Sequence, residues 1–258
     1  MPPPTIASLS TAKKLGIIVP STNTAVETMT ISLLASLQAN IIPIFTRTRV
    51  LTLGADAATQ AQFTPSAFIT AAQLLADAAP DAIIWNGTSG MFVNGASLAA
   101  DQALAKTMTD ACGGITCTTN TLATIAALEH FDIKDVSIAV PYTPEITQRV
   151  NEFFTKSGYT VHNTVRLDET PPTNADIGAV DAETIKDLVR RSVTPQTKAV
   201  LVACTNFPAT PLADELEKEL GVVVLDSIAV SAWYGLKLLG VKGTGEKMKE
   251  WGRLLSSL

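Results

Sequence analysis

Five short apolar runs, separated by stretches of helical character, constrain the fold of this chain more than any other feature. They lie at residues 15–20, 82–86, 136–141, 199–204 and 222–226. Each run is apolar at nearly every position rather than at every second one, so both faces of each strand are expected to be covered. Buried strands that alternate with helices are typical of parallel sheets, so the sequence predicts an α/β fold.

Four of the intervening stretches have the character of amphipathic helices: residues 65–79, 119–131, 143–158 and 181–193. The last three open on a Thr or an Asp. These side chains can accept hydrogen bonds from the free amides of a first helical turn, so we expect them to cap the helices.

Two segments of the chain occur twice. LGIIVPSTN, from Leu15, parallels VSIAVPYTP and pairs Pro20 with Pro141, at an offset of 141 − 20 = 121. AIIWNGTSG parallels AVLVACTNF and pairs Gly87 with Cys204, at an offset of 204 − 87 = 117. The common order and the similar offsets suggest a duplicated α/β unit, the alternative being a chance match of apolar strands. Two similar lobes would bring all four motifs to one cleft, because open α/β sheets bind ligands at their carboxyl ends.

Composition limits the classes of molecule that such a cleft can bind. The net charge of −5 gives no basic footprint for nucleic acid, and no apolar run reaches the roughly 20 residues that span a membrane. No apolar signal core precedes the first lysines, and three cysteines are too few for a disulfide framework, so a cytoplasmic location is expected. Two histidines without metal-ligand spacing, and no complete phosphate-binding glycine motif, predict neither metal nor nucleotide cofactor.

The turn after the second run carries hydroxyl groups. Gly87 leads into Thr88 and Ser89, whose hydroxyls and backbone amides can bind an anion, especially a carboxylate. An ordinary capped turn between strand and helix is the alternative. The Gly-Thr-Ser-Gly spacing differs from the elbow of serine hydrolases.

The equivalent turn in the second lobe carries a thiol. Cys204, followed by Thr205, would lie at a strand end and a helix N-terminus, where the pKa of a cysteine can be tuned. The alternative, a buried structural cysteine, fits Cys112 and Cys117 better, since they flank a connection between a helix and a strand. Tyr142, after the third run, can aim its phenol into the same cleft or serve as a packing aromatic.

Two asparagines complete the set of candidate substrate-binding residues. The PSTN segment places Pro20 at the cleft and Asn23 where its amide can hold another carboxylate. Asn174, in the segment TNADIG, is a weaker candidate on a loop that crosses the mouth of the cleft.

Taken together, these motifs resemble the aspartate/glutamate racemase superfamily, in the branch of maleate isomerases and arylmalonate decarboxylases. The resemblance spans roughly residues 15–241. It implies two pseudo-symmetric Rossmann-like lobes, no cofactor, and an active site in the cleft between the lobes. It also implies that the C-terminal helix returns to the first lobe, giving residues 1–122 with 227–258 as one lobe and 123–226 as the other. Members are often oligomers, so a homo-oligomer is a further expectation.

The motifs are similar to two different members of this branch. Its racemases and maleate isomerases carry a cysteine in both lobes, whereas this chain has Gly87 at the first position. Arylmalonate decarboxylases resemble this chain there, which implies that Thr88, Ser89 and Tyr142 hold a carboxylate. The maleate isomerases are similar in the segments of Asn23 and Asn174, which implies that these amides hold carboxylates too.

The chemistry favours the decarboxylase. Racemisation needs an acid and a base on opposite faces of a carbon, and isomerisation of maleate needs a nucleophile that glycine cannot supply. Decarboxylation of a malonate-type (arylmalonate-like) diacid needs one proton donor for the enediolate, and Cys204 can be that donor. The alternatives are a maleate or substituted-maleate isomerase, an Asp/Glu-type racemase, and a non-catalytic carboxylate binder. Gly87 is also expected to leave room for a large substituent, and a cysteine placed there to introduce isomerase-like or racemase-like exchange.

Overall fold

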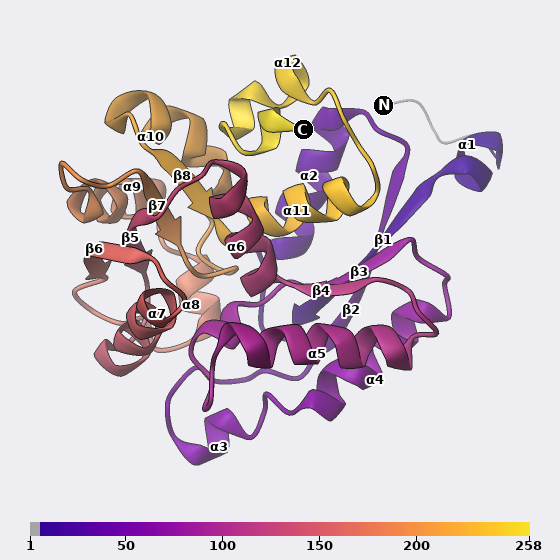
Figure 1. The fold of residues 1–258 in the computed structure, drawn as a ribbon, viewed down its shortest axis with the longest axis horizontal. Helices are drawn as coiled ribbons and strands as arrows, with labels where there is room; N and C mark the ends of the chain where they lie inside the picture. The colour runs from indigo at the N-terminus through magenta and orange to yellow at the C-terminus, as the bar shows by residue number, and fades with distance from the viewer. Residues whose placement is uncertain (1–5) are drawn as a thin grey trace.

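The computed structural model describes residues 6–258 and contains two four-stranded parallel sheets (Figure 1). The first sheet has the order β2-β1-β3-β4 and the second the order β6-β5-β7-β8. The strands are β1 (Lys13–Pro20), β2 (Ile41–Thr48), β3 (Ala82–Trp85), β4 (Cys117–Thr119), β5 (Asp135–Val140), β6 (Thr160–Arg166), β7 (Ala199–Val202) and β8 (Val223–Asp226). All five predicted strands are confirmed, and so is the α/β fold class.

Three strands escaped the sequence analysis. β2 and β6 lie at the outer edges of their sheets, and most of their residues are only partly buried. β6 therefore carries polar side chains, and the apolar run of β2 contains Pro43, a residue that argues against a central strand. β4 is three residues long, which is too short to show any periodicity.

The register of the strands supports the duplication that the sequence predicts. In the first sheet Ile18 pairs with Trp85, and in the second Ala139 pairs with Val202. The offset of 121 carries Ile18 onto Ala139, and the offset of 117 carries Trp85 onto Val202. Both offsets therefore bring the same pair of neighbours to the same place in the two sheets. We call the first sheet with its helices lobe 1 and the second lobe 2.

The four predicted helices form as α4 (Pro65–Ala76), α6 (Asn120–His130), α7 (Pro144–Lys156) and α9 (Ala182–Ser192). The predicted caps are confirmed, because Thr119, Thr143 and Asp181 each accept a hydrogen bond from a backbone amide three residues ahead. The other α-helices are α1 (Ile6–Thr11), α2 (Val26–Leu37), α3 (Ala57–Gln60), α5 (Leu98–Ala111), α8 (Asn174–Gly178), α10 (Ala213–Leu220), α11 (Ser227–Leu238) and α12 (Gly245–Met248).

Two helices pack against each other between the sheets. α6 and α11 lie side by side at the centre of Figure 1, and the Asn120 amide donates to the Ser227 carbonyl at 2.6 Å and to Ser231 Oγ at 2.8 Å. α11 contacts α2 and β3 of lobe 1, and also β8 of lobe 2. The predicted lobe boundaries stay a prediction, and the one after residue 122 falls inside α6.

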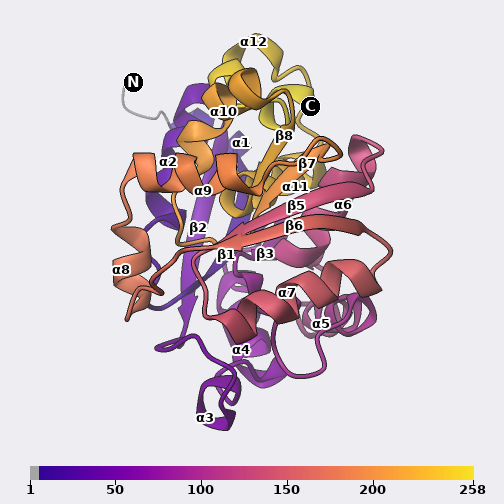
Figure 2. The same ribbon diagram turned by 90° about the vertical axis from the view of Figure 1, so that its left-hand side faces the viewer.

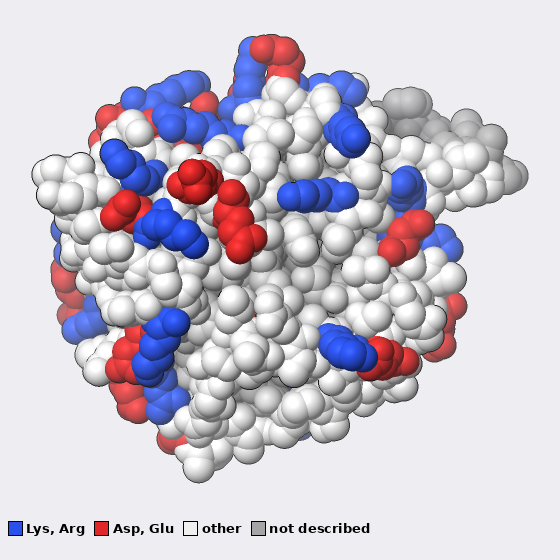
Figure 3. Space-filling model, viewed as in Figure 1, with Lys and Arg blue, Asp and Glu red and all other residues white. Residues whose placement is uncertain are grey.

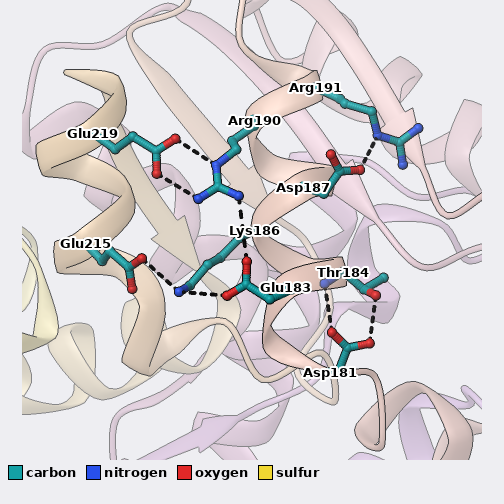
Figure 4. A network of polar contacts seen from close by, with 9 residues as sticks. All are labelled: Asp181, Glu183, Thr184, Lys186, Asp187, Arg190, Arg191, Glu215 and Glu219. Atoms are coloured by element: carbon teal, nitrogen blue, oxygen red, sulfur yellow. Dashed lines mark hydrogen bonds and ion pairs between the residues drawn. The ribbon is translucent and has the colours of Figure 1, made fainter.

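Paired helices cover one face of each sheet, and the pairs are held differently. α4 and α5 pack together below the first sheet in Figure 1, and no ion pair joins them in the part of the chain that the structure describes. In lobe 2, α9 is joined to α10 by Lys186–Glu215 at 2.8 Å and Arg190–Glu219 at 2.7 Å (Figure 4). Figure 2 shows α7 on the opposite face of that sheet from α9.

Charged side chains of both signs are interspersed around the rim of the face drawn in Figure 3, and its lower central part carries few of them. Within residues 6–258, no helix has the length and apolar character that crossing a bilayer requires.

Candidate active site

The carboxyl ends of the strands surround a small cavity of about 30 Å³. All nine residues predicted from the sequence line it: Pro20, Asn23, Gly87, Thr88, Ser89, Tyr142, Asn174, Cys204 and Thr205. Six further lining residues were not predicted: Val50, Leu53, Phe63, Trp85, Phe92 and Asn206. The structure thus brings the predicted residues together, while their individual roles stay predictions.

Cys204 follows β7 on the lobe 2 side of the cavity and is 3% exposed. Burial raises the pKa of its thiol to about 11, a hydrogen bond with the Tyr142 hydroxyl opposes that rise, and the charge of Asp226 adds to it. Cys204 is therefore a neutral thiol near pH 7 and carries a proton that it can donate. Cys112 and Cys117, in contrast, are buried in the apolar core of lobe 1.

Tyr142 reaches across the boundary between the lobes. It follows β5, and its hydroxyl lies 2.9 Å from Thr88 Oγ1 of lobe 1. Burial raises the pKa of the Tyr142 phenol well above its ordinary value, so the group stays neutral and keeps its proton. A neutral phenol beside a threonine hydroxyl is a pair of hydrogen-bond donors suited to an oxyanion.

Ser89 is oriented by the residue that ends β3. The Trp85 indole nitrogen donates to Ser89 Oγ at 3.2 Å. An indole N–H can only donate, so the serine oxygen is the acceptor and its own proton remains available for another partner. Ser89 is therefore a third donor beside Thr88 and Tyr142.

The orientation of the Asn23 amide is fixed by the helix that follows it. Its Oδ1 accepts from the backbone amides of Ala25 and Val26, each at 2.9 Å. Its Nδ2 consequently faces lobe 2, where it donates to Thr205 Oγ1 at 3.2 Å. The side chain thus caps α2 with its oxygen and presents its donor to the cavity.

Asn206 ties three segments together, and the sequence analysis did not assign it to the site. Its Oδ1 accepts from the Thr24 amide at 2.9 Å and from the Ala25 amide at 3.2 Å, and its Nδ2 donates to the Asn174 carbonyl. Asn174 in turn donates to Thr22 Oγ1 at 2.9 Å. The Cys-Thr-Asn triplet was the available signal, because an amide one position after Thr205 lies at the same strand end.

One expectation about Gly87 is wrong. A Cβ at this position would lie 2.3 Å from the nearest ring atom of Trp85, so the indole fills the place of a side chain. The glycine makes room for the protein's own tryptophan rather than for a large substituent. A cysteine at position 87 consequently does not fit unless Trp85 changes as well.

Apolar side chains form another part of the cavity wall. Val50, Leu53 and Phe63 come from the connection between β2 and α4, and Phe92 packs against Tyr142 with ring centroids 5.5 Å apart. The connection has no motif and no periodicity that would have revealed this role.

Neither histidine lines the cavity. Within residues 6–258, no group of three or more His, Cys, Asp or Glu side chains is placed to hold a metal ion. His162 bonds to Asp135 at 2.7 Å, and His130 lies exposed at the end of α6.

Comparison with known proteins decides the family. The family model described as arylmalonate decarboxylase matches residues 15–255. The chain belongs to the arylmalonate decarboxylase family. The branch predicted from the sequence, which also holds the maleate isomerases, is thereby confirmed.

Its relatives in this branch have two different names. The chain is 26% identical over 137 residues to the maleate isomerase of Alcaligenes faecalis, covering 53% of this chain and 52% of that protein. It is 28% identical over 154 residues to the arylmalonate decarboxylase of Bordetella bronchiseptica, covering 59% of this chain and 62% of that protein. The matched segment thus spans about half the length of the first relative and under two thirds of the second.

A solved structure shows the same fold over almost the whole chain. The maleate cis-trans isomerase of Nocardia farcinica, solved with a covalently bound succinylcysteine intermediate, superposes with a TM-score of 0.85. The match covers 95% of this chain and 98% of that one, at 22% identity. At this identity the likeness shows the fold alone. The two relatives above are named as enzymes.

Proposed function

We propose that this protein decarboxylates malonate-type diacids without a cofactor, with Cys204 as the proton donor. The proposal rests on one observation: a thiol stands on one wall of the cavity and has no counterpart on the opposite wall. Cys204 stands on the lobe 2 wall, whereas Gly87, at the equivalent place in lobe 1, has its side-chain space filled by Trp85. Of the fifteen residues that line the cavity, only Cys204 and Tyr142 are titratable.

The retained carboxylate of the substrate is placed against the hydroxyls of Thr88, Ser89 and Tyr142. Their hydrogen bonds strengthen as the enediolate forms, because negative charge moves onto the carboxylate oxygens. Each donor of this kind typically contributes 10²- to 10³-fold to kcat. Asn23 adds a fourth donor, whose orientation α2 fixes.

The leaving carboxylate is placed against the apolar wall of Val50, Leu53, Phe63 and Phe92. An ion is poorly solvated there, which favours its loss as neutral CO₂. The bond from the central carbon to this carboxylate breaks, and its electron pair stays on the substrate as the enediolate. Cys204 then donates its proton to the central carbon, and the resulting thiolate takes a proton from water.

An isomerase of maleate or of a substituted maleate is the second candidate. The donors of Asn23 and Asn174 suit two carboxylates, and several of the relatives are named maleate isomerase. That reaction needs a nucleophilic thiolate, and the raised pKa of Cys204 opposes one. We therefore rank the isomerase and the racemase below the decarboxylase. A non-catalytic carboxylate binder would use the same donors to hold a diacid without converting it.

The deciding experiment offers phenylmalonate and maleate separately to the purified protein. We expect CO₂ release from phenylmalonate and no conversion of maleate to fumarate by NMR. Conversion of maleate without CO₂ release would select the isomerase, and tight diacid binding without either product would select the binder.

Cys204→Ala tests the role of the thiol. We expect a loss of CO₂ release of about 10³-fold, in the range of a general acid. Cys112→Ala is the matched control, because Cys112 is also a buried free cysteine but does not line the cavity. Equal activity in the two variants would remove Cys204 from the mechanism.

A further inference from the structure

We infer that Trp85 makes this active site one-sided, by occupying the place of a lobe 1 acid or base and by holding Ser89 in its donor orientation. Trp85 is thus a specificity-determining and positioning residue. The inference rests on the proposed decarboxylation for its chemical meaning. Its geometry stands on the structure alone.

The position of the indole ring is the first observation. Trp85 ends β3, and because side chains alternate along an extended strand, residues 85 and 87 project to the same side. A Cβ on Gly87 would meet three ring atoms of Trp85, at 2.3, 2.7 and 2.8 Å. The backbone of Gly87 is extended (φ −155°, ψ 144°), so other residues fit its conformation. The ring, and not the backbone, therefore excludes a side chain here.

The support behind the ring is the second observation. Trp85 is 1% exposed, and its ring packs against Phe68 with centroids 4.7 Å apart. Its nitrogen donates to Ser89 Oγ at 3.2 Å. A large aromatic held by a hydrogen bond at one end and by an aromatic neighbour at the other cannot swing aside without losing both contacts.

The equivalent positions in lobe 2 show what the tryptophan replaces. The strand register makes Val202 the counterpart of Trp85, and Cys204 the counterpart of Gly87. In lobe 2 the smaller residue at 202 is followed by a side chain at 204 that lines the cavity. In lobe 1 the larger Trp85 takes the first position, and Gly87, two positions later, has no side chain. Trp85 and Gly87 are therefore a coupled pair, because a side chain at position 87 requires a smaller residue at position 85.

This coupling assigns one face of the reacting carbon to the indole. With an apolar ring opposite Cys204, no lobe 1 group delivers or removes a proton. A substrate with two different α-substituents therefore gives a product of one handedness, and no product exchanges its α-hydrogen through that face. A substituent on the substrate has to pack against the ring instead.

The first test is a double-mutant cycle on thermal unfolding, which needs no substrate. Gly87→Cys alone is expected to lower the unfolding midpoint by roughly 5 to 10 °C, because the thiol overlaps the ring. In the Trp85→Val background, which copies the Val-x-Cys pair of lobe 2, the same substitution is expected to cost at least 5 °C less. Trp85→Leu serves as a second background with a smaller cavity, in case the valine variant does not fold.

The second test follows deuterium exchange at the α-carbon of phenylacetate, the decarboxylation product of phenylmalonate. We expect the Trp85→Leu/Gly87→Cys variant to exchange at least tenfold faster than wild type, and Gly87→Cys alone to stay at the wild-type rate. If Gly87→Cys alone is as stable as wild type and exchanges rapidly, the role of Trp85 is overturned. If the stability cycle behaves as expected but no variant exchanges or decarboxylates, the proposed function fails while the placement of the ring stands.

The third test isolates the hydrogen bond to Ser89. Trp85→Phe keeps an aromatic ring but removes the N–H, and we expect kcat to fall about tenfold with a smaller change in KM. In a Ser89→Ala background the same substitution is expected to have little further effect. A purely structural role would instead lower activity equally in both backgrounds, and that outcome would remove the positioning role.

Discussion

The turn after β3 and the turn after β7 place a threonine at the same position but differ in the residue before it. Both carry a threonine that reaches a residue from the opposite lobe, Thr88 with Tyr142 and Thr205 with Asn23. They differ one position earlier, where one turn has Cys204 and the other has a bare glycine. Hydrogen bonding across the boundary between the lobes is thus two-sided, whereas the proposed proton transfer is one-sided.

The largest difference between the turns is expected from their threonines. Thr88→Val removes a proposed donor to the developing enediolate and one hydrogen-bond partner of the Tyr142 hydroxyl, so kcat is expected to fall 10²- to 10³-fold. Thr205→Val removes only an acceptor of the Asn23 amide, whose oxygen stays held by α2, and a loss of about tenfold is expected. Steady-state CO₂ release measures both, and equal losses would show that the two turns bind the substrate alike.

A second contrast lies where the next strands end. Thr119 and Asp226 occupy equivalent places, since the first pairs with Trp85 and the second with Val202. Thr119 caps α6 and donates to the buried carboxylate of Asp101, whereas Asp226 itself caps α11 and accepts from Thr210. The two lobes thus contain the same Asp–Thr pair with the partners exchanged.

This exchange predicts a matched pH dependence. Burial raises the pKa of Asp101 and of Asp226 from 3.8 to about 6. Between these values the folded protein binds more protons than the unfolded chain, so stability falls as the pH rises, by up to about 3 kcal/mol for each group. Urea unfolding at pH 5 and pH 7 should show a smaller difference in Asp101→Asn and in Asp226→Asn than in wild type. An unchanged difference in either variant would mean that its carboxyl titrates normally.

Ser89 and Asn206, two positions after Gly87 and Cys204, are expected to contribute differently to the free energy of unfolding. Asn206→Ala leaves the Thr24 amide and the Asn174 carbonyl without this partner, while the Ala25 amide keeps Asn23, and a loss of about 2 to 3 kcal/mol is expected. Ser89→Ala removes only the acceptor of the Trp85 indole, and a loss of about 1 kcal/mol is expected. Urea denaturation measures both losses, and the reverse order would contradict the larger structural role of Asn206.

The smallest effect is expected at the paired helices. Lys186→Ala breaks ion pairs with Glu183 and Glu215 on the surface of lobe 2, and should lower the urea midpoint less than any of the variants above. High salt should reduce the difference further. A loss as large as that of Asn206→Ala would show that lobe 2 depends on this network in a way that the uncharged pairing of α4 and α5 does not.

The sequence predicted the central strands and the cavity because their causes are local. A buried strand must be apolar throughout, and the residue after it must lie at the sheet's carboxyl edge, so Thr88, Tyr142 and Cys204 were found from their positions alone. The Trp85 ring was not found, because an apolar side chain at the end of a strand looks like core. Strand alternation puts residues 85 and 87 on the same side, but the contact of the ring with Gly87 depends on the rotamer of Trp85, which no sequence pattern encodes. Val50, Leu53 and Phe63 were missed since tertiary packing alone brings their connection to the cavity.

The cross-lobe bonds of Thr88 with Tyr142 and of Asn23 with Thr205 have one more consequence. The groups that would donate hydrogen bonds to a diacid already form hydrogen bonds with one another. Binding of the diacid therefore replaces existing hydrogen bonds and does not satisfy free donors. The net gain in free energy per contact is small. A bound diacid would nevertheless make hydrogen bonds to both lobes at once. Because stabilisation by a ligand follows the ratio of its concentration to Kd, the unfolding midpoint is expected to rise only at diacid concentrations well above Kd.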